Sequence, residues 1–167
     1  QDKPCGGIGL LCRNNKGLRS LSHLLTEMYT QPRSIQALAV ARNRLADFGT
    51  DMIGLSGGMD GEIGRFLRSG LIAEAAELYR KYQNIFGGHF FIEISRTGRA
   101  GEGDYEAKAL ELAMREGAAL VATNAVRFLA PSDFEAHEIR TCIHQGRVLD
   151  DPRRPRAFSA QQYLRTP

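Results

Sequence analysis

Apolar and polar residues along the chain follow two spacings, one typical of strands and one typical of helices. Short apolar runs with strand character occupy residues 8–14, 52–58, 89–95 and 119–124. Apolar side chains recur every three or four residues, as in helices, in the segments 18–29, 34–48, 61–70, 71–86, 104–116 and 132–146. Because the first and last of the strand runs are mostly apolar, we expect both of those strands to be buried.

Residues with known capping preferences mark the expected helix ends. Ser34, Asp104 and Ser132 are each expected to N-cap a helix. Glu135 is placed to complete a capping box with Ser132. The glycines that follow the last apolar positions of helices are Gly70, Gly87, Gly88, Gly117 and Gly146. Glycine ends a helix at such a place because it adopts a positive φ at little cost.

Strands and helices alternate with short connections and no internal repeat, which favours an α/β fold with a parallel sheet or barrel. The strands centred near residues 53, 91 and 121 are each followed by a loop. In a parallel sheet these loops lie along one rim, where α/β proteins keep their functional residues. We therefore expect any site at that rim.

The composition is that of an ordinary folded domain. Hydrophobic residues make up 43% and charged residues 25% of the 167, and no apolar run reaches the ~18 residues of a membrane span. The cysteines are odd in number and widely spaced, at Cys5, Cys12 and Cys142. That spacing argues against a disulfide framework or a zinc site and indicates a reducing, cytoplasmic location. Since the chain opens on Gln1 and ends without any stop-like feature, we expect it to be a piece of a longer polypeptide.

Charge divides the chain into a neutral body, 1–146, and a basic end, 147–167. The end contains five of the 22 basic side chains and two of the 19 acidic ones. We therefore expect a domain over 1–146 and an Arg/Pro-rich connector over 147–167. Arg153, Arg154 and Arg156 are candidate contacts to phosphate or nucleic acid, although a solvated connector explains the same residues equally well.

Ser56 lies in a Gly-x-Ser-x-Gly pattern at residues 54–58 that resembles the nucleophile elbow of hydrolases. No histidine is placed to complete a triad with it, so a tight structural turn is the better interpretation. His137 and His144 share a predicted helix face but lack the spacing of a zinc-binding helix. We expect both histidines at the surface or at an interface.

Glu93 and the arginine-bearing loop after it are candidates of another kind. Glu93 stands in an apolar strand and is expected to face solvent or a partner such as Arg96 or Arg127. Arg96 and Arg99 belong to the loop 96–103, RTGRAGEG, whose guanidinium and amide groups are suited to binding a phosphate. The loop lacks a P-loop lysine, so an ordinary flexible loop is the preferred interpretation.

Five stretches of the sequence resemble one protein family: GLSGGMDGEIGRFL, FIEISRTGR, VATNAVRFL, DFEAHEIRTCIHQGRVLDDPRRPR and FSAQQYLR. They are similar to the N-terminal PHP (polymerase and histidinol phosphatase) domains of bacterial replicative DNA polymerase III alpha subunits, in their proteobacterial form. The string over 133–165 is the most specific of them. The resemblance implies a distorted (β/α) barrel, PHP-like, that lacks its first βα units here.

In metal-binding members of that family an Asp-x-His pair follows the VATN strand, where this chain has Ala125 and Arg127. Members with an intact site often carry Cys at the position of Gly58. Ala and Gly do not ligate a cation, and Arg repels one. The resemblance therefore implies a vestigial metal-site rim without metal or catalytic residues, at Gly58, Glu93, Ala125 and Arg127. Arg127 is expected to pair with Glu93 across it.

The resemblance implies a structural, non-catalytic part of a polymerase subunit that is inactive alone and holds no cofactor. Its parent would perform template-directed DNA synthesis with Mg²⁺. The implied partners are the proofreading exonuclease (epsilon) subunit, which docks on this domain, other replicase subunits, and DNA through the parent, with no membrane contact. The alternative is a free-standing PHP-type metal-dependent phosphoesterase, which needs a complete ligand set. A third hypothesis, a nucleic-acid-binding module, is supported only by the basic end of the chain.

Overall fold

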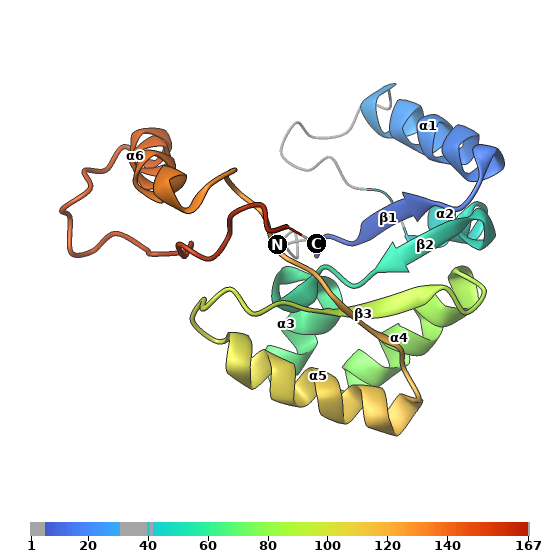
Figure 1. Cartoon of the computed structure of the whole chain (residues 1–167). Helices are drawn as coiled ribbons and strands as arrows, with labels where there is room; N and C mark the ends of the chain where they lie inside the picture. The colour runs from blue at the N-terminus through green and yellow to red at the C-terminus, as the bar shows by residue number, and fades with distance from the viewer. Residues whose placement is uncertain (1–5, 31–39, 41, 167) are drawn as a thin grey trace.

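The computed structural model describes residues 6–30, 40 and 42–166 and is built around one four-stranded sheet (Figure 1). The strands, in their order across the sheet, are β1 (Gly9–Cys12), β2 (Met52–Leu55), β3 (Phe90–Ile94) and β4 (Leu120–Ala122). β2, β3 and β4 are parallel, whereas β1 is antiparallel to β2. The predicted α/β class is confirmed, but the sheet is mixed rather than all parallel.

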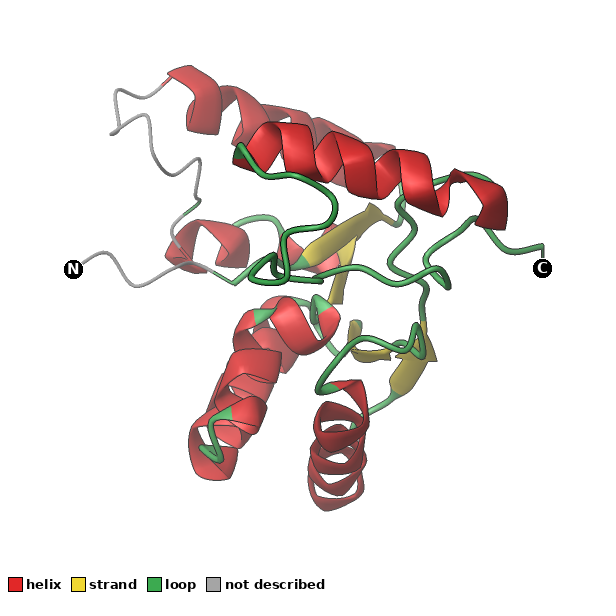
Figure 2. Cartoon of the chain, turned by 90° about the vertical axis from the view of Figure 1, so that its left-hand side faces the viewer, coloured by secondary structure: helices red, strands yellow, loops and turns green. Residues whose placement is uncertain are grey.

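The part of the chain that the structure describes contains six α-helices, of which α6 lies apart from the sheet (Figure 1). They are α1 (Asn15–Thr30), α2 (Arg42–Ala46), α3 (Glu62–Arg68), α4 (Ile72–Ile85), α5 (Glu102–Glu116) and α6 (Phe134–Gln145). In Figure 1, α3, α4 and α5 pack together below β3, and α1 lies above β1. Figure 2 shows the strands in the middle, with helices on two sides of them. None of these helices is long and apolar enough to cross a bilayer.

The core lies between the sheet and the helices α3, α4 and α5. Tyr82 of α4 and Phe86, which follows that helix, stack on Phe90 of β3, with ring centroids 4.8 and 5.7 Å from that of Phe90. Gly54 on β2 faces these rings. A Cβ there would lie 2.6 Å from a ring atom of Phe90 and 2.7 Å from one of Phe86. Packing, rather than backbone conformation, therefore explains why a glycine interrupts this apolar strand.

β1 and β4 form the two edges of the sheet, which corrects the prediction that both strands are buried. Leu11 of β1 is 52% exposed and Leu120 of β4 is 39% exposed. The central strands bury Met52, Phe90 and Ile92 instead. An edge strand has a neighbour on one side only, and the apolar character of a short run does not reveal that position.

The predicted helix ends at glycines are confirmed, because Gly70, Gly117 and Gly146 each adopt a positive φ just after a helix. The prediction of Asp104 as an N-cap is wrong, because α5 begins at Glu102, after Gly101. Asp104 lies inside its first turn and pairs with Lys108 one turn later.

The start of α6 also differs from the prediction. A 3-10 turn over Pro131–Asp133 precedes the helix, and the Asp133 carboxylate accepts a hydrogen bond from the Ala130 amide. Ser132 therefore does not cap α6, and it forms no capping box with Glu135. Of the helix predicted over 34–48, the structure describes the short helix α2 (Arg42–Ala46), and residues 34–39 and 41, Ser34 among them, lie outside the described residues.

Replacing Gly54 by Ala is expected to destabilise the domain. The added Cβ overlaps two fully buried rings, and overpacking of this kind costs about 1–3 kcal/mol. Gly103→Ala is the matched control, because Gly103 lies in α5 with no atom within 4 Å of the added Cβ. Ala there favours the helix by up to about 1 kcal/mol. Urea unfolding measures both changes, and equal midpoints for the two variants would contradict the packing role of Gly54.

Candidate functional site

The loops that follow β2, β3 and β4 meet around a hollow of about 350 Å³ at the C-terminal ends of these strands. This position confirms the expected common rim, because the three parallel strands end there. Gly57 and Gly58 turn the chain beside it, with φ of +78° and +59°. Of the predicted rim residues, Gly58, Glu93 and Ala125 line the hollow. Arg127 lines a different one.

Glu93 holds the turn that follows β2. Its carboxylate accepts a hydrogen bond from the Gly57 amide, and its own amide donates to Ser56 Oγ over 2.9 Å. The Tyr105 hydroxyl donates to the Glu93 carbonyl over 2.7 Å, and burial raises the pKa of Tyr105 to about 12. Ser56 is 1% exposed, and none of the residues described around the hollow is a histidine. Ser56 is therefore part of a structural turn and lacks the partners of a nucleophile.

Arg127 takes another position because the chain leaves the rim after Ala125. Its amide donates to the Gln162 carbonyl over 2.8 Å. Its guanidinium lies over the ring of Phe158, 5.5 Å from the centroid. The expected ion pair between Arg127 and Glu93 is therefore wrong: each side chain is held by a different part of the chain.

The C-terminal segment, residues 147–166, packs against the rim loops. Gln162, which is fully buried, donates from Nε2 to the Ala125 carbonyl over 2.9 Å. Asn124 donates from Nδ2 to the Tyr163 carbonyl over 2.8 Å. These contacts were not predicted, because neither amide side chain belongs to a periodic pattern and the two partners of each bond are distant in sequence. The role of the C-terminal segment as a connector to a further domain stays a prediction.

Two carboxylates border the hollow, those of Asp60 and Glu93. Asp60 pairs with Arg99 over 2.8 Å, and Glu93 is bound to the Gly57 amide. Across the described residues, no three His, Cys, Asp or Glu side chains are grouped so that they could hold a metal ion. Zinc and other transition metals need several such ligands. The donor set around this hollow does not fit a bound metal cluster.

The loop between β3 and α5 is held by a side chain from the first turn of α5. Glu102 is buried at the start of α5. Its carboxylate accepts hydrogen bonds from the amides of Thr97, Gly98 and Arg99 at 2.8, 2.7 and 3.2 Å. Successive amides of this kind form an anion-binding nest, and here the protein's own carboxylate occupies it. Glu102 was missed at the sequence level, although an acidic residue just after a glycine-rich loop is a recognisable signal.

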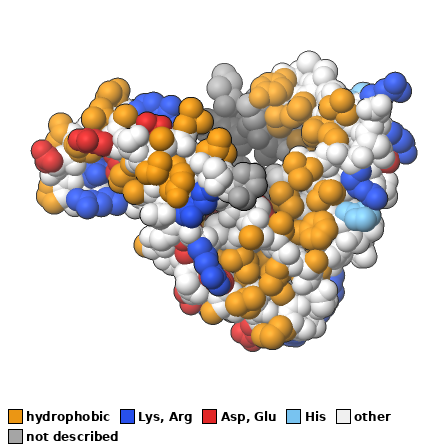
Figure 3. All heavy atoms as spheres, in the orientation of Figure 1, with side chains coloured by type: hydrophobic (Ala, Val, Ile, Leu, Met, Phe, Trp, Pro, Cys, Tyr) orange, Lys and Arg blue, Asp and Glu red, His pale blue; other side chains and the backbone are white. Residues whose placement is uncertain are grey.

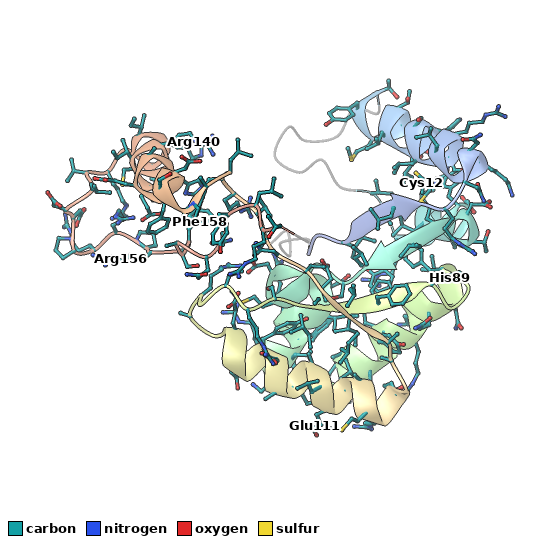
Figure 4. The ribbon with its side chains drawn as sticks, viewed as in Figure 1. Cys12, His89, Glu111, Arg140, Arg156 and Phe158 are labelled. Atoms are coloured by element: carbon teal, nitrogen blue, oxygen red, sulfur yellow. The ribbon has the colours of Figure 1, made fainter. Side chains whose placement is uncertain are left out.

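Four of the five arginines predicted to contact phosphate are paired with carboxylates. The pairs are Arg96–Glu106, Arg99–Asp60, Arg153–Asp151 and Arg154–Glu138. The last pair is buried on both sides. Arg156 is exposed on the outer part of the C-terminal segment (Figure 4). A phosphate contact by these residues stays a prediction, and for the paired ones it competes with an existing carboxylate.

His137 and His144 occupy different environments on α6. His144 is exposed, whereas His137 is 8% exposed and packs against the ring of Phe158, with centroids 4.6 Å apart. Of the two predicted positions, surface or interface, the surface is confirmed for His144 and is wrong for His137, which is buried within the chain. Residues 147–166 fold back over that side of the helix and cover it.

Comparison with known proteins gives one consistent result. Residues 6–97 match the PHP domain family. The chain is 41% identical over 167 residues to DNA polymerase III subunit alpha of Pseudomonas aeruginosa, covering all of this chain and 14% of that protein. It is 42% identical over 159 residues to that of Escherichia coli K12 and 43% over 160 residues to that of Haemophilus influenzae, in each case covering 95% of this chain. The chain thus spans about 14% of the length of these relatives.

Glu102→Gln is expected to lower the free energy of unfolding by about 2 kcal/mol or more, because a neutral amide replaces the charged acceptor of several buried hydrogen bonds. Glu111→Gln is the matched control. Glu111 lies exposed on the same helix (Figure 4), where a substitution changes stability by no more than about 0.5 kcal/mol.

Urea unfolding and amide hydrogen exchange test this expectation. Exchange should become faster in Glu102→Gln at the amides of residues 97–99, which Glu102 binds. Unchanged protection of those three amides would contradict the proposed internal nest.

Proposed function

The chain belongs to the PHP domain family, and we propose that it is a structural, non-catalytic portion of a DNA polymerase III alpha subunit. The mixed sheet and its helices are consistent with part of a PHP-like barrel. The relatives' names support a parent that performs template-directed DNA synthesis. In this proposal the Mg²⁺ for that reaction is held elsewhere in the parent, and the whole protein works in the cytoplasm.

The observation that carries this proposal is that the acidic side chains of the rim are already bonded to other groups of the protein. The rim glutamate, Glu93, is used to hold the Gly57 turn, and Asp60 is used to hold Arg99. Ala125 offers only its backbone, and its carbonyl accepts a hydrogen bond from Gln162. Side chains at a catalytic metal site must be free to bind the metal and the substrate. Here they bind the protein itself, which suits a structural role.

The same proposal assigns the proofreading exonuclease (epsilon) subunit and other replicase subunits as partners, with DNA bound through the parent. Support comes from apolar side chains exposed around α6: Leu129, Ile143 and Val148 are 74%, 75% and 68% exposed. Side chains of this kind favour burial against another protein. A partner that covers them would contact α6 and the start of the C-terminal segment.

A free-standing phosphoesterase is a weaker alternative. That activity needs several metal ligands around one cavity, and the hollow at the strand ends offers two carboxylates that are already paired. No feature of the described residues favours this alternative over a structural role.

The first functional prediction is that the chain alone neither extends a primer nor hydrolyses phosphoesters. Primer extension and p-nitrophenyl phosphate hydrolysis are measured with added Mg²⁺, Mn²⁺ or Zn²⁺, and an intact alpha subunit serves as the positive control for extension. We expect no activity above a mock preparation. Activity that persists in homogeneous protein and is lost in Glu93→Gln would contradict the proposal.

The second prediction concerns docking of the exonuclease subunit. Ile143→Glu places a charge on the exposed face of α6 and is expected to weaken binding by about ten-fold, since burying an unpaired carboxylate is unfavourable. Met114→Glu is the matched control, because Met114 is 80% exposed on α5.

Binding to the purified exonuclease subunit is measured by calorimetry or sedimentation. An equal loss in the two variants would remove α6 from the proposed interface. If the unmodified chain does not bind, this segment is not the docking site.

A further inference from the structure

A second hollow, of about 310 Å³, lies on the part of the molecule formed by residues 127–166, which we call the α6 lobe. It is lined by residues 127–129 and by α6 residues that include His137 and Arg140. Figure 3 shows Lys and Arg side chains on this lobe and where it meets the rest of the molecule. The hollow is separate from the rim at the strand ends, with which it shares no lining residue.

His137 is the most unusual residue of this hollow. It is 8% exposed, and its ring lies between those of Phe128 and Phe158, with centroids 5.5 and 4.6 Å away. Its Nδ1 atom is buried and has no hydrogen-bond partner. Buried polar atoms are normally paired, so this ring stands out among the side chains that line the hollow.

Two arginines face the same hollow without a carboxylate partner. Arg140 lies on α6 (Figure 4), and Arg127 is held over the ring of Phe158, a contact that leaves its charge uncompensated. The structure gives neither guanidinium an ion pair with any described residue. The one acidic residue of the lining, Asp133, already accepts a hydrogen bond from the Ala130 amide over 2.9 Å.

We infer that this hollow binds an oxyanion of the phosphate class, held by Arg127 and Arg140 and completed by His137. Guanidinium groups donate pairs of hydrogen bonds to tetrahedral oxyanions, and two of them around one small hollow favour such a ligand over a metal or a neutral group. The neighbouring aromatic rings hold His137 and Arg127 in place before the ligand arrives. This site was not among the sequence-level candidates and differs from the carboxylate-paired arginines described above.

The electrostatics of His137 support this assignment. Burial lowers its pKa below the ordinary value, the positive charges of Arg140 and Arg127 lower it further, and Glu138 opposes them. Glu138 is itself paired with Arg154. A bound anion offsets the two arginines and stabilises the protonated imidazole, so the pKa of His137 rises on binding. By linkage, the anion then binds more tightly below the pKa of the bound state and loses affinity as the pH rises through it.

Sulfate is a suitable probe because it stays doubly charged while histidine titrates, between about pH 5 and 8. The full chain is titrated with sulfate, and the imidazole resonances of His137 are followed by NMR at several pH values against a sodium chloride control of equal ionic strength. We expect saturable shifts at His137, a higher pKa with sulfate, and tighter binding at low pH. Shifts that chloride reproduces would overturn the site.

Arg140→Gln should weaken sulfate binding by about ten-fold, the loss expected for one charge-assisted contact. Arg19→Gln, an exposed arginine on the distant helix α1, is the matched control and should leave binding unchanged. His137→Gln should retain binding at high pH and lose its pH dependence. Equal effects of Arg140→Gln and Arg19→Gln would overturn the proposal, as would a pH dependence that survives in His137→Gln.

Competition identifies the source of the phosphate group. Inorganic phosphate and a short single-stranded oligonucleotide are each tested for displacement of sulfate from His137. Displacement by both assigns the site to backbone phosphates as well as free phosphate, and displacement by inorganic phosphate alone assigns it to the free ion. If neither displaces sulfate, the hollow is not a phosphate site.

Discussion

The ends of β2 and β3 are joined by two hydrogen bonds of Glu93, one with Ser56 and one with Gly57, and the rest of the rim depends on them. The Glu93 amide donates to the Ser56 hydroxyl, and the Glu93 carboxylate binds the amide of the next residue, Gly57. Both strands end at a glycine-bearing turn or an irregular loop, where the sheet no longer pairs backbone groups. The side chains of Ser56 and Glu93 form hydrogen bonds with these backbone groups, and so fix where each loop leaves the sheet.

Other parts of the chain are anchored by the same principle. Glu102 binds the amides of residues 97–99, and Gln162 binds the carbonyl of Ala125. Each bond pairs a side chain with backbone groups that have no helix or sheet partner. The C-terminal segment is therefore held without forming a strand or a helix of its own, and the buried pair of Arg154 with Glu138 fixes it to α6.

These contacts also show that groups of the chain itself hold the rim in shape. In an intact site, ligand side chains are held in place partly by the ion they share. Here the acidic side chains of the rim are held by an amide and by an arginine. The loops thus stay in place through contacts within the chain.

The sequence by itself determined the types of the elements and their approximate positions: the strands predicted at 8–14, 52–58, 89–95 and 119–124, most of the helices between them, and the glycines that end those helices. These features follow from local periodicity and from the positive φ that glycine tolerates. Only the tertiary structure decided that β1 and β4 are edges, that Arg127 stacks on Phe158 instead of pairing with Glu93, and that His137 is buried. Each of these features depends on contacts between segments that are far apart in the sequence, and the local spacing of hydrophobic residues carries no information about such contacts.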